Sequence, residues 1–288
     1  MPPRVPRIAA AHDLSCFGRC SLSVIIPVLS ALGIQACPLP TAVLSTHLGG
    51  FSGPVFCDFT DRMTGFYQHW QQEAITFDCI YTGFLASNTQ IDVVLRFIEQ
   101  FSANQPLVLV DPVMGDEGRL YSAYTPAMQE QMKKLVARAD VITPNYTEAC
   151  FLLREAYQPD AICTGQLAEW LIRLTDLGPS MAVITGIPCK KGIISNLAYD
   201  KTNKTYWQTT NKQIPVRYPG TGDIFASVLA GALLQGADLR QALELAADFV
   251  AHCAAITYQA ATPVREGVLL EEALPKLWNN RKEVRNRG

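Results

Sequence analysis

The chain has 288 residues, of which 49% are hydrophobic and 17% are charged, and its formal net charge is −2. This composition predicts a globular protein with a large core rather than a disordered chain. Nucleic-acid-binding surfaces are strongly basic, so the near-neutral charge argues against nucleic acid as a partner and favours a small-molecule substrate.

Strand-like and helix-like segments alternate along most of the chain, which is typical of a parallel sheet covered by helices on both faces. In chain order, the segments predicted as strands are residues 5–11, 34–44, 77–82, 107–110, 141–142 and 181–185. The helices predicted between them are residues 21–32, 58–73, 88–101 (capped by Asn88), 125–139, 145–153 and 164–177.

The last third of the chain has a different pattern. A hairpin is predicted from residues 192–199 and 204–209, followed by helices over 221–235, 239–259 and 267–278 and a charged, frayed tail from about 281. No linker or repeat divides the chain, so we expect one α/β domain spanning residues 1–288, with three layers and a mostly parallel central sheet. In such sheets, ligands bind beyond the carboxyl ends of the strands.

Membrane insertion and secretion are not expected. No apolar stretch approaches the ~18–20 residues that a spanning helix needs. The longest candidates, residues 24–34 and 225–234, are interrupted by Pro27 and Gly231. The N-terminal apolar segment is too short for a signal peptide, so we expect a cytoplasmic protein without a membrane partner.

The nine cysteines do not indicate a disulfide framework, because their number is odd and their spacing irregular. His12, Cys16 and Cys20 have a spacing that would suit a metal on a helix. Gly18 within the segment and the lack of a fourth ligand argue against a zinc site there.

Two glycines precede the apolar helix in the segment Pro219-Gly220-Thr221-Gly222-Asp223. Glycines allow the backbone to approach a ligand closely, and a helix N-terminus presents free N–H groups and a positive dipole end. The segment therefore predicts an anion site. Alternatively, Asp223 is only a charge that complements the helix dipole.

Two further polar segments follow predicted strands. Asp111 and Asp116 lie after an uninterrupted apolar strand, where two carboxylates can hold a divalent metal through water. The alternative is an ordinary turn fixed by Asp and Pro. Thr143, Asn145 and Glu148 follow the next strand, where the alternative is a capping box at a helix start. Three such segments at strand ends, in this order, favour a shared site.

With these motifs, the sequence resembles the ribokinase-like superfamily and, within it, the pyridoxal (vitamin B6) kinases. The resemblance extends from about residue 7 to about residue 257. The matching segments are Asp111-Pro112-Val113-Met114-Gly115-Asp116, Thr143-Pro144-Asn145 with Glu148, Gly220-Thr221-Gly222-Asp223, and Leu44-Ser45-Thr46-His47 with Gly49.

The resemblance implies an enzyme that uses ATP and Mg²⁺ to phosphorylate the 5′-hydroxyl of pyridoxal, pyridoxine or pyridoxamine. Asp223 would be the catalytic base, the amides of Gly220, Thr221 and Gly222 the anion hole, and Asp111, Asp116 and Glu148 the metal ligands. The implied ATP-binding residues are Asp111, Tyr121, Thr143, Thr185, Gly186, Ile214, Val216 and Thr221. The implied substrate-binding residues are His12, Ser45, His47, Leu48, Phe84 and Asp223. A monovalent cation is a further candidate cofactor, and the family is commonly dimeric, so a homodimer is expected.

The substrate end departs from the family pattern. His12 stands where the family often has Ser, and Leu48 stands where it often has Thr. His12 could donate to the pyridine nitrogen or the 3-hydroxyl, or be satisfied by the backbone. Leu48 can only pack, so one expected hydrogen bond is missing. Phe84 could stack on the vitamin ring or belong to the core.

Other functions are weighed against this interpretation. Hydroxymethylpyrimidine kinases share two of the motifs but typically carry Cys where this chain has Asp223, and a sugar kinase is a further alternative. A non-catalytic vitamer-binding protein on the same scaffold would not need a base at that position. The chain has no Gly-x-x-x-x-Gly-Lys-Ser/Thr loop, which excludes a P-loop kinase.

Overall fold

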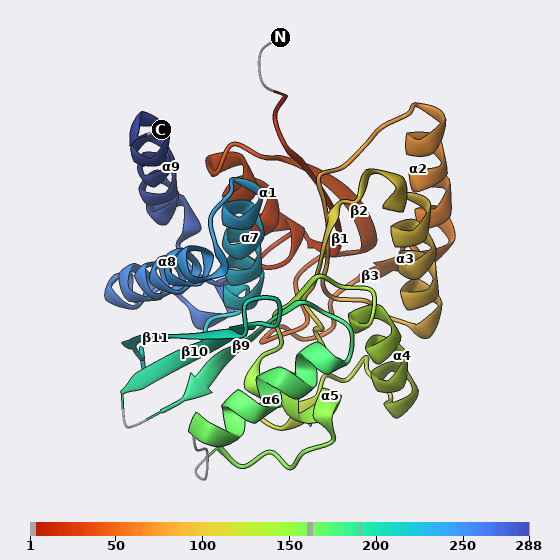
Figure 1. The fold of residues 1–288 in the computed structure, drawn as a ribbon. Coiled ribbons are helices and arrows are strands. Elements are labelled where there is room, and N and C mark those ends of the chain that lie inside the picture. The colour runs from red at the N-terminus through yellow and green to blue at the C-terminus, as the bar shows by residue number, and fades with distance from the viewer. Residues whose placement is uncertain (1–3, 160–163, 190–191, 288) are drawn as a thin grey trace.

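The computed structural model describes residues 4–159, 164–189 and 192–287. In this part of the chain, nine strands form one sheet in the order β11-β10-β9-β8-β5-β4-β1-β2-β3 (Figure 1). The strands are β1 (Arg7–Ser15), β2 (Gln35–Leu44), β3 (Phe56–Asp58), β4 (Cys79–Thr82), β5 (Leu107–Val110), β8 (Val141–Ile142), β9 (Met181–Pro188), β10 (Ile193–Asp200) and β11 (Thr205–Lys212). A separate small hairpin pairs β6 (Gly115–Asp116) with β7 (Arg119–Leu120).

The central strands are parallel and the edges are antiparallel. β2, β1, β4, β5, β8 and β9 pair in parallel, whereas β3 and the hairpin β10–β11 are added antiparallel at the two edges. The predicted mostly parallel sheet and its hairpin are confirmed. Short β3 and the β6–β7 hairpin were not predicted, because segments of two or three residues carry no readable periodicity.

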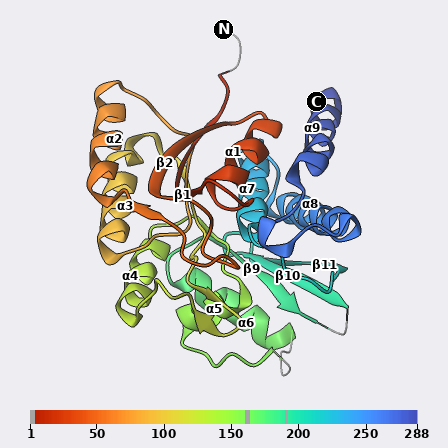
Figure 2. The same cartoon turned by 180° about the vertical axis from the view of Figure 1, so that it is seen from behind.

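Helices cover both faces of the sheet (Figures 1 and 2). One layer contains α2 (Thr60–Gln72), α3 (Asn88–Gln100), α4 (Pro126–Val136), α5 (Tyr146–Leu153) and α6 (Thr164–Asp176). The other contains α1 (Leu22–Ala31), α7 (Thr221–Leu234), α8 (Leu239–Ala260) and α9 (Leu270–Arg287). This is the expected three-layer arrangement.

The strands supply both cores by alternation. In β1, Ala9 and Ala11 join the core under α2–α6, whereas Ile8 and Ala10 join the core under α1 and α7–α9. Successive side chains of a strand point to opposite faces, so a strand buried on both sides is apolar throughout. This explains the uninterrupted apolar sequence of β5.

Several predicted helix ends differ from the structure by a few residues, and two of the differences have a local physical reason. Ser87 rather than Asn88 caps α3, because its side chain accepts the backbone N–H of Gln90. The last helix continues beyond residue 278, through the segment expected to fray, and ends at Arg287. No Gly or Pro occurs between Trp278 and Arg287 to end it. Among the described residues, no helix is both long enough and apolar enough to cross a bilayer.

Candidate active site

A cavity of about 620 Å³ lies among the loops that follow the strands. The three predicted motifs line it together, as expected for the carboxyl edge of a parallel sheet. The predicted residues in its lining are His47, Leu48, Phe84, Asp111, Asp116, Tyr121, Thr143, Glu148, Thr185, Gly186, Ile214, Val216, Gly220, Thr221, Gly222 and Asp223. The structure does not place His12 or Ser45 in that lining.

The start of α7 is shaped for an anion. Gly220 is the N-cap residue and has a φ of 79°. A Cβ at this position would overlap the carbonyl oxygen of Arg19, so both the left-handed backbone and the close approach require glycine. Thr221 donates its hydroxyl to the carbonyl of Tyr218 at 3.1 Å, which fixes the turn. The first amides of α7, which have no acceptor within the helix, therefore lie at the cavity.

The two carboxylate oxygens of Asp223 have different surroundings. Oδ2 accepts the backbone N–H of Ser21 at 2.8 Å and the thiol of Cys20 at 3.4 Å. Oδ1 accepts no hydrogen bond from the described residues, and Nδ1 of His12 lies 3.9 Å from it. The fixed Oδ2 orients the carboxylate and leaves Oδ1 available as a proton acceptor.

Burial raises the pKa of Asp223 to about 6. Nearby Asp13 also raises this pKa, whereas the hydrogen bonds from Ser21 and Cys20 lower it. A carboxylate with this pKa is mostly ionised at neutral pH, yet it is more basic than an ordinary Asp. The geometry and the pKa therefore both suit a general base.

Ser21 connects the first helix to this base. It precedes α1 with a φ of 53°, an uncommon value for a residue other than glycine. Its N–H points to Asp223, and its hydroxyl donates to Asp13 Oδ1 at 2.6 Å. The N-termini of α1 and α7 thus converge on Asp223, and both dipoles favour its ionised form.

His12 lies behind the base and not in the cavity. Its ring lies in the second half of β1, is completely buried and packs against Tyr81 with ring centroids 4.3 Å apart. Neither ring nitrogen has a hydrogen-bond partner among the described residues, and burial lowers the pKa of His12 to about 3. The imidazole is therefore neutral. A Cβ on Gly83 would overlap this ring, so the glycine creates the space for it.

The three predicted metal ligands do not form a ready-made cluster. Among the described residues, no three His, Cys, Asp or Glu side chains are close enough to hold a metal together. Glu148 is buried, and its two oxygens accept the N–H groups of Met114 and Asn145 at 3.0 and 2.8 Å. Asp116 is half exposed and pairs with Arg217. Asn145 and Glu148 form a capping box at the start of α5, and this leaves the role of Glu148 at the metal a prediction.

Asp111 and Glu148 nevertheless form a pair of buried acidic side chains whose negative charges are not compensated by a cationic side chain among the described residues. Burial and the charge of Asp223 raise the pKa of Asp111 to about 8. Burial and the charge of Asp111 raise the pKa of Glu148. Two neighbouring buried carboxylates repel one another, and a hard divalent cation bound by oxygen ligands and water would relieve that repulsion. The donor set at this position therefore fits Mg²⁺.

At the substrate end, His47 is part of the loop structure. Its Nδ1 accepts the N–H of Gly49 at 3.1 Å, so its Nε2 donates to the carbonyl of Arg265, 2.7 Å away. Both nitrogens are thus engaged. Leu48 is exposed in the cavity wall, and Phe84 is buried in the wall against Tyr124. Ser45 is exposed and accepts the N–H of Val55.

The nucleotide-binding residues that the resemblance implies lie in loops and at strand ends. The N–H of Thr185 donates to the carbonyl of Pro144, and the N–H of Gly186 donates to the side chain of Asn196 at 3.1 Å. Tyr121 reaches the cavity from the loop after β7 and is 41% exposed. These residues lie in the lining with Thr143, Ile214 and Val216.

Sequence reasoning did not assign several cavity residues whose side chains could take part in chemistry, among them Asp13, Cys20, Ser21, Lys212 and Arg217. Asp13 and Ser21 could have been found, because Asp13 follows the first predicted strand and Ser21 begins the first predicted helix, at the same edge as the other motifs. Nothing in the sequence indicates that Cys20 contacts Asp223, which is 203 residues further along the chain.

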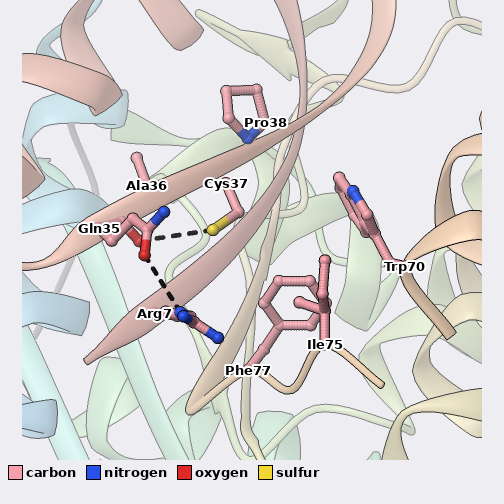
Figure 3. Close-up of a pocket in the computed structure, with 8 residues that line it drawn as sticks. All are labelled: Arg7, Gln35, Ala36, Cys37, Pro38, Trp70, Ile75 and Phe77. Atoms are coloured by element: carbon pink, nitrogen blue, oxygen red, sulfur yellow. Dashed lines mark hydrogen bonds between the residues drawn. The ribbon is translucent and has the colours of Figure 1, made fainter. Parts of the chain in front are cut away.

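A second hollow of about 340 Å³ lies away from these residues, between β1, β2 and the end of α2 (Figure 3). Its lining includes Arg7, Cys37, Trp70 and Phe77. Arg7 donates to the side chain of Gln35 at 3.1 Å, and no carboxylate is in the lining. This hollow therefore lacks the groups needed for acid–base or metal chemistry.

Comparison with known proteins identifies the family to which this chain belongs. The family model for phosphomethylpyrimidine kinase matches residues 69–267. The pyridoxal kinase of Arabidopsis thaliana is 31% identical over 228 residues, covering 73% of this chain and 68% of its own. The chain belongs to the phosphomethylpyrimidine kinase family and, within it, to the pyridoxal kinases.

Solved structures in this family share the whole fold. The Lactobacillus plantarum pyridoxal kinase is 31% identical with a TM-score of 0.87, and the match covers 97% of this chain and 99% of that one. A Bacteroides thetaiotaomicron protein, provisionally assigned as a phosphomethylpyrimidine kinase, is 44% identical in a crystal form with pyridoxal. Its TM-score is 0.91, and the match covers 95% of this chain and 96% of that one. The predicted ribokinase-like fold is confirmed.

Proposed function

We propose that this enzyme transfers the γ-phosphoryl group of ATP to the 5′-hydroxyl of pyridoxal, pyridoxine or pyridoxamine. The observation that carries the proposal is Asp223, which presents one unbonded carboxylate oxygen beside the amides of Gly220–Gly222 in a single large cavity. The crystal form of the 44% identical Bacteroides thetaiotaomicron protein with pyridoxal supports the choice of a B6 vitamer.

The proposed step needs a base and an anion hole. Asp223 Oδ1 accepts the proton of the 5′-hydroxyl, the hydroxyl oxygen forms a bond to the γ-phosphorus, and the bond from that phosphorus to the β–γ bridging oxygen breaks. The products are the B6 5′-phosphate and ADP, and the proton remains on Asp223. The N–H groups at the start of α7 stabilise charge on the transferring group.

Mg²⁺ would be held by Asp111 and Glu148, with water completing its coordination, and would supply positive charge for the phosphates. Asp116, the third predicted ligand, pairs with Arg217, and its role as a metal ligand stays a prediction. Tyr121, Thr143, Thr185, Gly186, Ile214, Val216 and Thr221 would line the nucleotide site.

For the vitamer, we propose Leu48 and Phe84 as the walls that contact the ring. His47 holds the loop at residues 45–49, and His12 lies behind Asp223, so neither is placed in hydrogen bonding to the vitamer. Ser45 lies outside the lining. A monovalent cation, a homodimer and a cytoplasmic location stay predictions.

The test is phosphorylation by the purified chain with MgATP. The panel contains the three B6 vitamers, hydroxymethylpyrimidine and ribose, and the phosphorylated product is identified by mass. We expect the vitamers to give a 5′-phosphate at the highest kcat/KM. Turnover of hydroxymethylpyrimidine alone would instead support the thiamin-precursor kinase, and vitamer binding without any product would support a non-catalytic binding protein.

A further inference from the structure

Arg217 occupies a particular place along the cavity. It follows Ile214 and Val216, which line the proposed nucleotide site, and precedes Gly220, where the anion hole begins. The chain from residue 214 to residue 223 therefore extends along the cavity from the nucleotide to the catalytic base. Arg217 thus lies in the cavity lining between the residues proposed for the nucleotide and the proposed anion hole along the chain.

The guanidinium of Arg217 is held only by exposed acidic side chains. Its Nη1 lies 3.3 Å from an oxygen of Asp116 and 3.3 Å from an oxygen of Glu117, both on the β6–β7 hairpin. No hydrogen bond within the described residues involves its Nε or Nη2. The side chain is 55% exposed, and ion pairs of this kind contribute at most ~1 kcal/mol. Arg217 can therefore exchange these partners for a stronger anion.

The charges in the cavity wall favour that exchange. The described lining contains the carboxylates of Asp13, Asp111, Asp116, Glu148 and Asp223 but only two cationic side chains, Lys212 and Arg217. A nucleotide polyphosphate adds further negative charge to this acidic wall. A guanidinium binds phosphate oxygens through two parallel hydrogen bonds, which a carboxylate-rich wall cannot offer.

We propose that Arg217 binds the polyphosphate of the nucleotide, and that Asp116 and Glu117 hold its side chain in position until the nucleotide arrives. This rests on the proposed use of a nucleoside triphosphate. Asp116 then acts as a positioning residue for Arg217 on the hairpin. Arg217 then adds positive charge to the phosphates of the nucleotide.

The test compares ADP with adenosine, which lacks phosphate, in calorimetric titrations of wild type, Arg217→Gln and Arg217→Lys. A charge-assisted hydrogen-bonding group lost from a phosphate site should weaken ADP about 10- to 100-fold in Arg217→Gln. Adenosine affinity should not change. Arg217→Lys should have an intermediate ADP affinity, because lysine keeps the positive charge but cannot donate the two parallel hydrogen bonds of a guanidinium.

Two further variants separate a phosphate contact from damage to the hairpin. Arg119→Gln removes a guanidinium from β7, on the same hairpin but outside the cavity lining, and should leave ADP affinity unchanged. Glu117→Gln removes a holding partner and should leave ADP affinity unchanged or raise it. Unchanged ADP binding in Arg217→Gln would overturn the proposal, as would equal losses for ADP and adenosine or a loss in Glu117→Gln as large as in Arg217→Gln.

These titrations contain no vitamer, so they do not depend on which substrate is phosphorylated. Wild-type protein that binds ADP but phosphorylates no vitamer would contradict the proposed function and leave the role of Arg217 standing. Wild-type protein that binds no ADP would contradict both. With turnover measured as well, Arg217→Gln should raise KM for ATP by a larger factor than it lowers kcat.

Discussion

Two carboxylates that line the cavity differ in how their oxygens are used. Glu148 accepts a backbone N–H on each oxygen, from Met114 and from Asn145. Asp223 has both of its hydrogen bonds on Oδ2 and none from the described residues on Oδ1. Both lie in the first turn of a helix.

This difference supports the proposed roles, in which Glu148 also fixes the loop structure and Asp223 acts as the base. Glu148 joins the loop after β5 to the start of α5, and its remaining lone pairs are available only for outer contacts such as metal-bound water. Asp223 keeps a free oxygen, and the buried histidine beside it offers no hydrogen bond that would occupy that oxygen. A hydrogen bond to each oxygen holds a carboxylate in place, whereas an oxygen that accepts none can take a proton.

The largest effect should come from removing the free acceptor. Asp223→Asn keeps the shape and the N–H contact from Ser21 but cannot take a proton, so kcat should fall ~10²-fold or more. Binding of ADP should remain close to wild type. Asp238→Asn is the matched control, because Asp238 caps the next helix outside the cavity and Asn caps equally well. Turnover near wild type in Asp223→Asn would remove this residue from the mechanism.

The pH profile tests the same oxygen in the unmodified enzyme. A base must be ionised, and burial raises the pKa of Asp223 to about 6, so kcat/KM should fall about tenfold per pH unit below that value. An ordinary Asp would give this loss only near pH ~4. The profile is measured with two vitamers. If the pH at which kcat/KM begins to fall differs between the two vitamers, the ionising group belongs to the substrate, which would contradict the assignment to Asp223.

Gly83→Ala should disturb the substrate end through packing. The new Cβ overlaps the buried His12 ring, and overpacking of this kind costs ~1–3 kcal/mol in the free energy of unfolding. Gly65→Ala in α2 is the control, because its Cβ meets nothing within 4 Å and helix propensity favours Ala. Both are measured by urea unfolding. If Gly83→Ala is as stable as wild type, His12 is not held as tightly as its complete burial indicates.

Glu148→Gln tests the contribution of the two backbone hydrogen bonds that Glu148 accepts. The variant keeps one acceptor oxygen but places an amide NH₂ against a backbone N–H, which should cost ~1–2 kcal/mol of stability. Glu99→Gln, on the exposed end of α3, should change stability by less than ~0.5 kcal/mol. If Glu148→Gln leaves unfolding unchanged and lowers only activity, then the residue acts mainly through metal and phosphate, and its two backbone contacts contribute little to stability.

Much of this arrangement could be predicted from the sequence. Alternating strands and helices predicted the parallel sheet, and the carboxyl-edge rule predicted that Asp111, Glu148 and the segment at residues 220–223 meet at one site. Glycines and a helix start indicated the anion hole, because these are local backbone properties. The short strands β3, β6 and β7 were missed, since two or three residues show no periodicity.

The sequence by itself therefore determined the fold class and the edge of the sheet that holds the site, and it predicted Asp223 as the proposed base, because these depend on periodicity and on short contiguous motifs. Only the tertiary structure decided that His12 is buried behind Asp223, that His47 is engaged by Arg265, and that Arg217 pairs with Asp116. These facts depend on contacts between segments up to 218 residues apart. Side-chain burial and hydrogen-bond partners at such separations are set by packing of the whole chain, which no local pattern records.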